Sequence, residues 1–201
     1  MLPVLVLLAS VDPALDRVAA QLQQSKAWQA EFVQVFLPAG FAKGEEQRGI
    51  LTFAHPARVR FEYTSKPRRV FATDGVLARM VDLEAGTCQA VKVDSHTWSS
   101  IPLASLSDPG ALRQAFQVEE RTPVITLIPR QASASITKVT VTVDAAYLPQ
   151  ELLVEDPSGN TNRFAFHRWR PLSQADPKLF SPAPPGQEPC RPRDDNPEFQ
   201  R

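Results

Sequence analysis

The feature that most constrains the fold of this chain is an alternation of apolar and polar residues with a period of two. It is clearest over residues 58–63, where Arg58, Arg60 and Glu62 separate the large apolar side chains. A period of two places successive side chains on opposite faces of a β-strand. The segment is therefore expected to be a strand with one buried face.

The same pattern recurs along most of the chain. Asp74-Gly75 is a strong hairpin signal, and Pro157-Ser158-Gly159-Asn160 marks another turn. Because successive strands follow one another at hairpin spacing, we expect an antiparallel sheet. The expected strands lie near residues 32–36, 49–55, 58–63, 68–73, 76–84, 87–93, 117–121, 124–128, 138–143, 151–155 and 163–167.

A helical period precedes the first strand. Over about 13–26, Leu15, Val18 and Leu22 share one face, and Asp12-Pro13 is a favourable start. A shorter helix is expected to begin at Asp108-Pro109, where the alternation is interrupted. These helices are too small to fill the apolar face of a sheet of about ten strands, unless that sheet curls. A curled sheet with a small lid leaves a cavity, and a solid β core is the alternative.

The length indicates a single domain, and the charge composition argues against nucleic acid as a partner. The chain has 201 residues, of which 43% are hydrophobic, and its 22 basic residues balance 22 acidic ones. This balance does not favour nucleic acid as a partner. We expect a single domain over 11–187 and an irregular tail over 188–201, after prolines that become frequent from residue 182.

Residues 1–10 form a short apolar run that is typical of a secretory signal. The run is shorter than the roughly 20 apolar residues needed to cross a bilayer. It also lacks the positive region that usually precedes such a run. We expect export, and a buried N-terminal strand is the alternative.

The two cysteines, Cys88 and Cys190, fit no zinc or redox motif. In an oxidising compartment they could pair and close a loop of about 100 residues, a link that would stabilise the fold by about 4 to 5 kcal/mol through lost chain entropy. The alternative is two free thiols.

No motif for catalysis or for binding a metal or cofactor is present in the sequence. It has no Gly-x-Ser-x-Gly elbow and no phosphate-binding glycine loop, and His55, His96 and His167 are scattered. We therefore expect that the protein is not an enzyme and binds no metal or cofactor. A catalytic pair assembled from distant strands stays open as an alternative.

Short motifs follow one another in a fixed order over about residues 28–187. They are Phe32-x-Gln34-x-Phe36, Gly49-x-Leu51-x-Phe53-x-x-Pro56, Arg58-x-Arg60-Phe61-Glu62-Tyr63, Pro67, Asp74-Gly75, Leu148-Pro149, Asp156-x-x-Gly159-Asn160, Phe164-x-Phe166 and Phe180-x-Pro182-x-Pro184-Pro185-Gly186. This ordered set resembles the periplasmic outer-membrane lipoprotein carrier family, LolA.

The resemblance implies both a fold and a function. The fold is mainly β (α+β): an unclosed antiparallel β-barrel of about ten or eleven strands, with a helical lid over a hydrophobic cavity. The implied function is to carry triacylated lipoproteins across the periplasm, from an inner-membrane lipoprotein-releasing ABC transporter to an outer-membrane acceptor. We expect the protein to be a monomer and to bind no nucleic acid.

The resemblance also implies where the cavity lies. Val59, Phe61 and Tyr63 match the strand that lines the family's cavity near its mouth, Leu51 and Phe53 lie on the neighbouring strand, and Phe32 and Phe36 extend the same apolar face. The lid would contact the sheet through Leu15, Val18, Leu22 and His55.

His55 is a departure from the family pattern. Many members have an arginine directly before the proline of the third strand, where it hydrogen-bonds the lid. Imidazole has fewer donors than guanidinium and is mostly neutral above about pH 6.5. We therefore expect a weaker or pH-sensitive lid contact, and an ordinary strand-end histidine is the alternative.

Two other functions remain open at this point. One is a carrier of another amphiphile, such as a glycolipid or pigment precursor. The other is a regulatory module that senses lipid, although sensors of that kind usually carry an extra domain.

Overall fold

The computed structural model describes residues 13–93 and 102–192. The predicted signal segment 1–10, residue Asp12 and the last nine residues of the predicted tail lie outside this part. Within it, eleven strands form one antiparallel sheet in the order β6-β5-β4-β3-β2-β1-β11-β10-β9-β8-β7. The strands are β1 (Ala27–Leu37), β2 (Glu45–Ala54), β3 (Arg58–Tyr63), β4 (Arg69–Thr73), β5 (Leu77–Asp82), β6 (Thr87–Lys92), β7 (Phe116–Arg121), β8 (Val124–Pro129), β9 (Lys138–Val143), β10 (Pro149–Glu155) and β11 (Thr161–Leu172).

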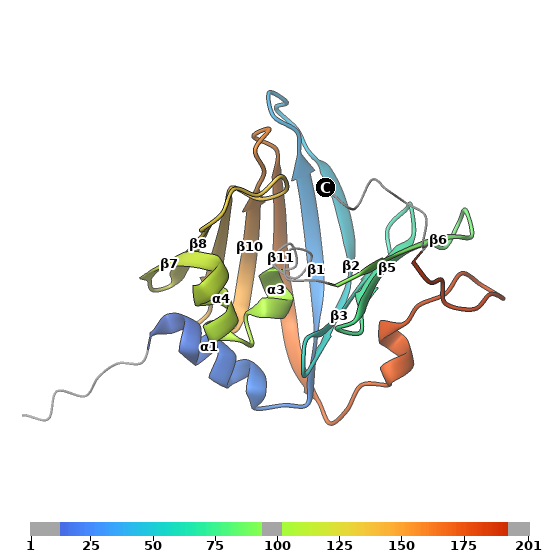
Figure 1. Cartoon of the computed structure of the whole chain (residues 1–201), viewed down its shortest axis with the longest axis horizontal. Coiled ribbons are helices and arrows are strands. Elements are labelled where there is room, and N and C mark those ends of the chain that lie inside the picture. The colour runs from blue at the N-terminus through green and yellow to red at the C-terminus, as the bar shows by residue number, and fades with distance from the viewer. Residues whose placement is uncertain (1–12, 94–101, 193–201) are drawn as a thin grey trace, which may run out of the picture.

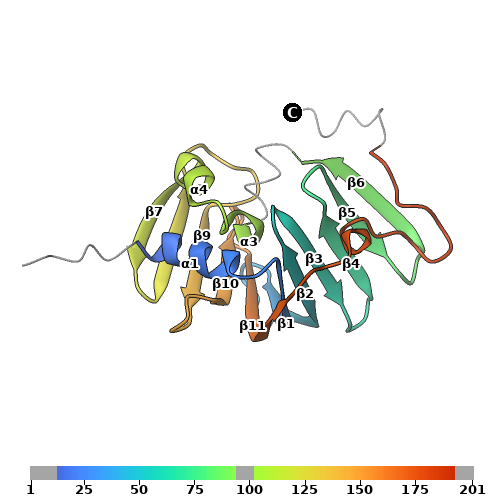
Figure 2. The same cartoon turned by 90° about the horizontal axis from the view of Figure 1, so that it is seen from below.

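The sheet is bent into a trough that does not close. Its order begins at β6 and ends at β7, and these edge strands stand on opposite sides of the trough (Figures 1 and 2). The central pair is β1 and β11, which come from opposite ends of the chain. The predicted mainly β fold, an unclosed antiparallel barrel, is confirmed.

Within the described residues, three helices form the lid: α1 (Ala14–Gln23), α3 (Pro102–Ser105) and α4 (Pro109–Ala115). They lie over the concave face of the sheet, with α1 and α4 on the side of β7 to β10 (Figure 2). Helix α1 starts one residue later than predicted, because Pro13 is extended and provides no side-chain cap. Glu120 of β7 caps it instead, since its Oε2 accepts a hydrogen bond from the Leu15 amide at 3.2 Å.

The hydrophobic core lies between the lid and the concave face. In β3 the alternation predicted from the sequence places Val59, Phe61 and Tyr63 on this face, with exposed fractions of 0%, 6% and 7%. The apolar residues of the lid and of the concave face form one continuous cluster. Burial of this shared surface holds the lid on the sheet.

Gly49 in β2 allows the largest side chains of the concave face to pack. It lies in register between Phe32 of β1 and Tyr63 of β3. A Cβ at this position would be 2.6 Å from the Phe32 ring and would also collide with the carbonyl oxygen of Glu62. Without it, the Phe32 ring packs edge to face against Phe61 and Tyr63, at centroid distances of 5.3 and 5.2 Å.

The chain after β11 covers part of the opposite, convex face. The short helix η1 (Pro177–Phe180) contacts β3 and β4, and Phe180 is fully buried against Ala27 and Ala54. Arg60, on the convex face of β3, donates from Nη1 to the carbonyl of Leu179 at 2.9 Å. The outside of the trough is therefore not simply a solvated sheet face.

A disulfide bond fixes the end of this segment. Cys88 of β6 and Cys190 are bonded, with their Cα atoms 5.9 Å apart. Arg79 of β5 adds a second contact, because its Nε donates to the Cys190 carbonyl at 3.1 Å. Residues 188–192 are irregular, yet the disulfide and this hydrogen bond hold them against β5 and β6.

We predict that Gly49→Ala lowers the free energy of unfolding by about 1 to 3 kcal/mol, because the added methyl group overpacks the Phe32 ring. Urea unfolding followed by circular dichroism measures this loss. Gly110→Ala is the matched control, since its Cβ would meet only Asp108 Oδ1 at 3.4 Å, in helix α4. Equal midpoints for the two variants would contradict the prediction.

We predict that the double variant Cys88→Ser/Cys190→Ser loses about 3 to 5 kcal/mol of folding free energy, because the link closes a loop with a sequence separation of 102 residues. Reducing the wild-type protein should give the same shift in the urea midpoint. If the midpoint does not move in either case, the link does not constrain the unfolded chain.

Candidate functional site

A continuous set of aromatic rings crosses the concave face of the sheet. Centroids of neighbouring rings lie 5.2 to 6.4 Å apart, within the range of favourable aromatic contacts. The rings belong to Phe71 of β4, Phe61 and Tyr63 of β3, Phe32 and Trp28 of β1, and Phe164, Phe166 and Trp169 of β11. We call this set the aromatic floor.

The structure brings six of the seven sequence-predicted cavity residues together on this face. They share one cluster, and none is more than 7% exposed. They are Phe32, Leu51, Phe53, Val59, Phe61 and Tyr63.

Phe36 is separate from the other six. It lies on the same face of β1 as Phe32, but it is 39% exposed and outside the core cluster. The reason is strand length: β1 and β2 have 11 and 10 residues, whereas β3 has six, so the far end of the β1–β2 hairpin projects beyond β3.

The predicted lid residues of α1 face the aromatic floor. Leu15, Val18 and Leu22 have exposed fractions of 0%, 0% and 1%, and they belong to the same cluster as the floor. The helical spacing seen in the sequence therefore corresponds to a real apolar stripe. In this structure the lid is seated on the sheet.

Two side chains bind the C-terminal end of α1 through a single carbonyl oxygen. The carbonyl of Leu22 accepts from Trp28 Nε1 at 2.8 Å and lies 2.8 Å from His55 Nε2. A carbonyl can only accept, so His55 must donate through Nε2–H. Both the neutral imidazole and the imidazolium can do so, and protonation therefore does not break this contact.

Sequence reasoning missed Trp28 as a lid contact. It stands two residues before Ala30 and four before Phe32, so the period of β1 already places it on the concave face. What could not be deduced is that its indole N–H reaches back to the helix that precedes the strand.

An ionic network fixes the other end of α1. Arg113 of α4 pairs with Asp16 of α1 at 2.6 Å and with Glu120 of β7 at 3.3 Å. Hydrogen bonding to Arg113 holds the pKa of the Asp16 carboxyl below its usual value. A carboxyl whose pKa is lowered on folding stabilises the fold above its ordinary pKa, and this contribution is lost as the pH falls through the lowered value.

The floor carries few polar groups. Burial raises the pKa of Tyr63 to about 12, so its phenol stays neutral at physiological pH. Gln34 donates to Asn162 Oδ1 at 2.8 Å, while its own Oε1 is buried with no hydrogen-bond partner in the structure. A surface of this kind binds apolar groups without selecting their detailed shape, because dispersion and hydrophobic contacts have little directionality.

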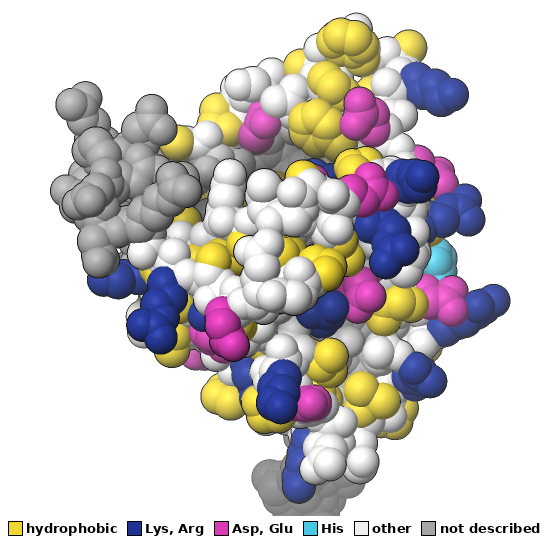
Figure 3. All heavy atoms as spheres, turned by 90° about the vertical axis from the view of Figure 1, so that its right-hand side faces the viewer, with side chains coloured by type: hydrophobic (Ala, Val, Ile, Leu, Met, Phe, Trp, Pro, Cys, Tyr) yellow, Lys and Arg dark blue, Asp and Glu magenta, His cyan; other side chains and the backbone are white. Residues whose placement is uncertain are grey.

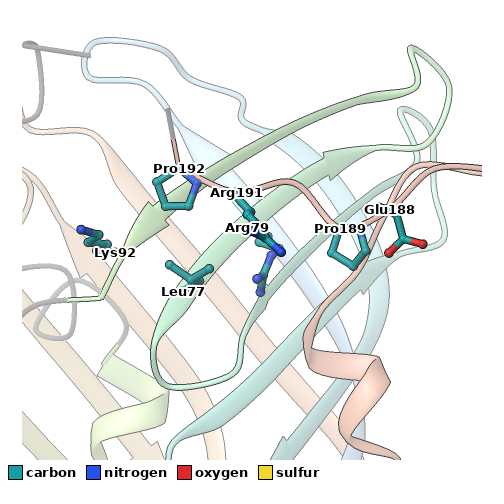
Figure 4. A pocket seen from close by; sticks show the side chains of 7 residues that line it. All are labelled: Leu77, Arg79, Lys92, Glu188, Pro189, Arg191 and Pro192. Atoms are coloured by element: carbon teal, nitrogen blue, oxygen red, sulfur yellow. The ribbon is translucent and has the colours of Figure 1, made fainter. Parts of the chain in front are cut away.

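A separate pocket lies on the convex side, away from the floor. It has a volume of about 610 Å³ and is formed between β5, β6 and the C-terminal segment (Figure 4). Its lining residues are Leu77, Arg79, Lys92, Glu188, Pro189, Arg191 and Pro192. Arg79 is already held by Asp74 Oδ2 and the Cys190 carbonyl, so in this pocket it serves to attach the tail.

Two kinds of feature are not found in the part of the chain that the structure describes. Residues 13–93 and 102–192 hold no group of three or more His, Cys, Asp or Glu side chains that could bind a metal ion. The same residues include no helix with both the length and the apolar character that a membrane span requires.

Comparison with known proteins agrees with this geometry. Residues 23–183 match the family described as outer membrane lipoprotein carrier protein LolA. The outer-membrane lipoprotein carrier protein of Chromohalobacter salexigens is 23% identical over 155 residues, which cover 75% of this chain and 73% of that protein.

Solved structures with a similar fold have low sequence identity. An uncharacterized conserved protein from Thermus thermophilus has a TM-score of 0.52 and 12% identity, covering 87% of this chain and 94% of that one. A LolA superfamily protein from Nitrosomonas europaea has a TM-score of 0.47 and 10% identity, covering 84% and 96%. The family match spans all eleven described strands and the lid helices α3 and α4, and on that basis the chain belongs to the outer membrane lipoprotein carrier protein LolA family.

Proposed function

We propose that this protein is a periplasmic carrier that binds the acyl chains of triacylated lipoproteins. It would receive them from an inner-membrane lipoprotein-releasing ABC transporter and deliver them to an outer-membrane acceptor. In this proposal residues 1–10 are the export signal and residues 11–187 are the carrier domain. The proposal rests on family membership together with the aromatic floor beneath a small lid.

The aromatic floor is the observation that carries the proposal. It offers apolar surface along several strands, and the side chains that cover it include Leu15, Val18 and Leu22 of α1. These aliphatic groups resemble an acyl chain in chemistry. A chain that entered would exchange one set of apolar contacts for another.

The energetics explain why a carrier of this kind needs such a surface. Each methylene removed from water contributes about 0.8 kcal/mol, so a chain of roughly 15 methylenes in water costs on the order of 12 kcal/mol. Three chains on one lipoprotein could not cross an aqueous compartment unshielded. Binding must also be reversible, and exchange with the lid keeps the net free energy of binding well below this gross value.

The polar contacts of α1 suit this exchange. At one end α1 is held through the Leu22 carbonyl, and at the other through Asp16 and Arg113. Each contact is a hydrogen bond or a partly exposed ion pair, worth about 1 kcal/mol or less. No covalent step is needed, and we propose that the protein is not an enzyme.

The test of the carrier role is a release assay. Purified protein is added to spheroplasts that make an outer-membrane lipoprotein, and the soluble fraction is examined for a one-to-one complex. We expect release, and we expect Phe61→Ser to reduce it severalfold because a polar group enters the floor. Phe61→Leu, which keeps the site apolar, should retain most of the release.

Leu179→Ser is the matched control, because Leu179 is 37% exposed on the convex side. Each variant is first checked for folding by urea unfolding. No release by the wild-type protein, with a known carrier active alongside, would overturn the lipoprotein role, and lipids that co-purify with the protein would then be extracted and identified.

We predict that His55→Ala loosens α1, because it removes one of the two donors to the Leu22 carbonyl. Hydrogen–deuterium exchange of residues 14–23 should speed up about fivefold, which corresponds to a hydrogen bond worth about 1 kcal/mol. Exchange in β8 should not change, and His55→Arg should restore protection. Unchanged exchange of α1 in the alanine variant would show that His55 does not hold the lid.

A further inference from the structure

The two ends of the trough differ in shape and chemistry. The hairpin that joins β1 to β2 extends beyond the other loops at the end opposite to α1 (Figure 1). Its tip, residues 37–44, reads Leu-Pro-Ala-Gly-Phe-Ala-Lys-Gly. Phe41 in this tip is 68% exposed, and Phe36 just below it is 39% exposed.

The tip is held in place rather than free. The amide of Ala39 donates to Asn160 Oδ1 in the adjacent β10–β11 turn at 2.9 Å. Gly40 has a φ of +80°, which permits the tight turn that presents Phe41 outward. An apolar tip fixed in an exposed position loses little conformational entropy when it binds.

Basic side chains accompany the tip. In an antiparallel sheet the β1–β2 and β3–β4 loops lie at the same end, and the Thr64 amide donates to the carbonyl of Arg48, which pairs with Val33 four residues before the tip begins. Lys43, Lys66 and Arg68 are exposed and form no ion pair with the described residues. Seen from the side of β6, hydrophobic side chains gather at the top of the molecule, with basic and acidic groups beside them (Figure 3).

The loops at this end carry more basic than acidic residues. Loops 38–44, 64–68, 83–86, 130–137 and 156–160 contain four basic and two acidic residues, and Glu46 of the adjoining β2 is paired with Arg48 at 2.8 Å. At the opposite end, the loops 24–26, 55–57, 74–76, 122–123 and 144–148 contain two acidic residues and one lysine. The end that carries Phe41 is therefore the more basic one.

We propose that this end of the molecule docks on the surface of an anionic phospholipid bilayer, with Phe41 inserted at the interface, Lys43 beside the headgroups, and Lys66 and Arg68 facing the anionic surface from the β3–β4 loop. Apolar insertion beside basic groups is a known way for proteins to bind such surfaces reversibly.

The size of the tip favours a bilayer over a protein groove. A stable protein interface buries about 800 Å² on each partner, far more than one aromatic side chain and its neighbours present. A bilayer interface has no such requirement, because it deforms around a convex tip. The proposal goes beyond the carrier function and does not depend on what the protein carries.

The test is co-sedimentation of the protein, purified from the periplasm of an expression host, with vesicles of phosphatidylcholine containing phosphatidylglycerol. We expect binding that weakens as salt is added. Phe41→Ser should reduce the partition coefficient about tenfold. Charge reversal by Lys43→Glu/Lys66→Glu/Arg68→Glu should reduce it further, by about fivefold for each residue.

Two matched controls separate this surface from general effects. Val76→Ser changes an apolar side chain that is 70% exposed at the opposite end. Lys26→Glu/Arg121→Glu/Lys178→Glu makes the same change in net charge at exposed residues elsewhere. Neither control should alter binding.

Insertion can be followed directly with Phe41→Trp. Its fluorescence should be quenched by brominated lipid, whereas a tryptophan introduced by Val76→Trp should not be. Three results would overturn the proposal: no binding of the wild-type protein, equal losses in the control variants, or binding only to vesicles that contain a reconstituted membrane protein. The last result would identify a protein partner instead.

Discussion

Burial of the concave face is the constraint on which the rest of the structure depends. An open sheet of eleven strands has an apolar inner surface that it cannot close by pairing its edge strands. The lid supplies part of the missing cover, with Leu15, Val18 and Leu22 reaching the same cluster as the aromatic floor. Because the hydrophobic effect is proportional to area and not directional, this cover can be exchanged for another apolar group of similar size. Stability of the fold and capacity for ligand therefore come from the same surface.

A comparison of magnitudes shows how exchange can be reversible. Three buried aliphatic side chains contribute about 5 to 9 kcal/mol in total, and one acyl chain of roughly 15 methylenes contributes on the order of 12 kcal/mol. The difference, about 3 to 7 kcal/mol, is well below the gross contribution of the acyl chain. The polar contacts at Leu22 and Asp16 further stabilise the state in which the lid covers the floor. A tightly bonded lid would exclude the ligand, and a lid with no polar ties would leave the floor exposed to water.

Sequence pattern predicted the elements and their faces better than the contacts between distant elements. The alternation in β3 identified Val59, Phe61 and Tyr63 as inward-facing, because side-chain direction in a strand depends only on parity. The alternation could not reveal that Phe36 lies outside the buried core cluster, since that depends on the unequal lengths of β1 and β3. Nor could it reveal that Glu120 caps α1 across 105 residues. The pairing of Cys88 with Cys190 remained open from sequence alone because it depends on the path of the C-terminal segment around the outside of the trough.

The polar contacts of the lid and the exposed Phe41 lie at opposite ends of the trough, and this separation bears on how the lid can move. The lid is tied at the end that holds the β2–β3 turn, through His55, whereas Phe41 lies at the far end of β1. A strand of 11 residues spans roughly 35 Å at about 3.3 Å per residue. In the docked orientation proposed above, the ties of α1 stand well above the membrane surface, so α1 can leave the floor without meeting the bilayer. The disulfide between Cys88 and Cys190 and the helix η1 hold residues 177–190 on the convex face, so this segment does not obstruct that movement.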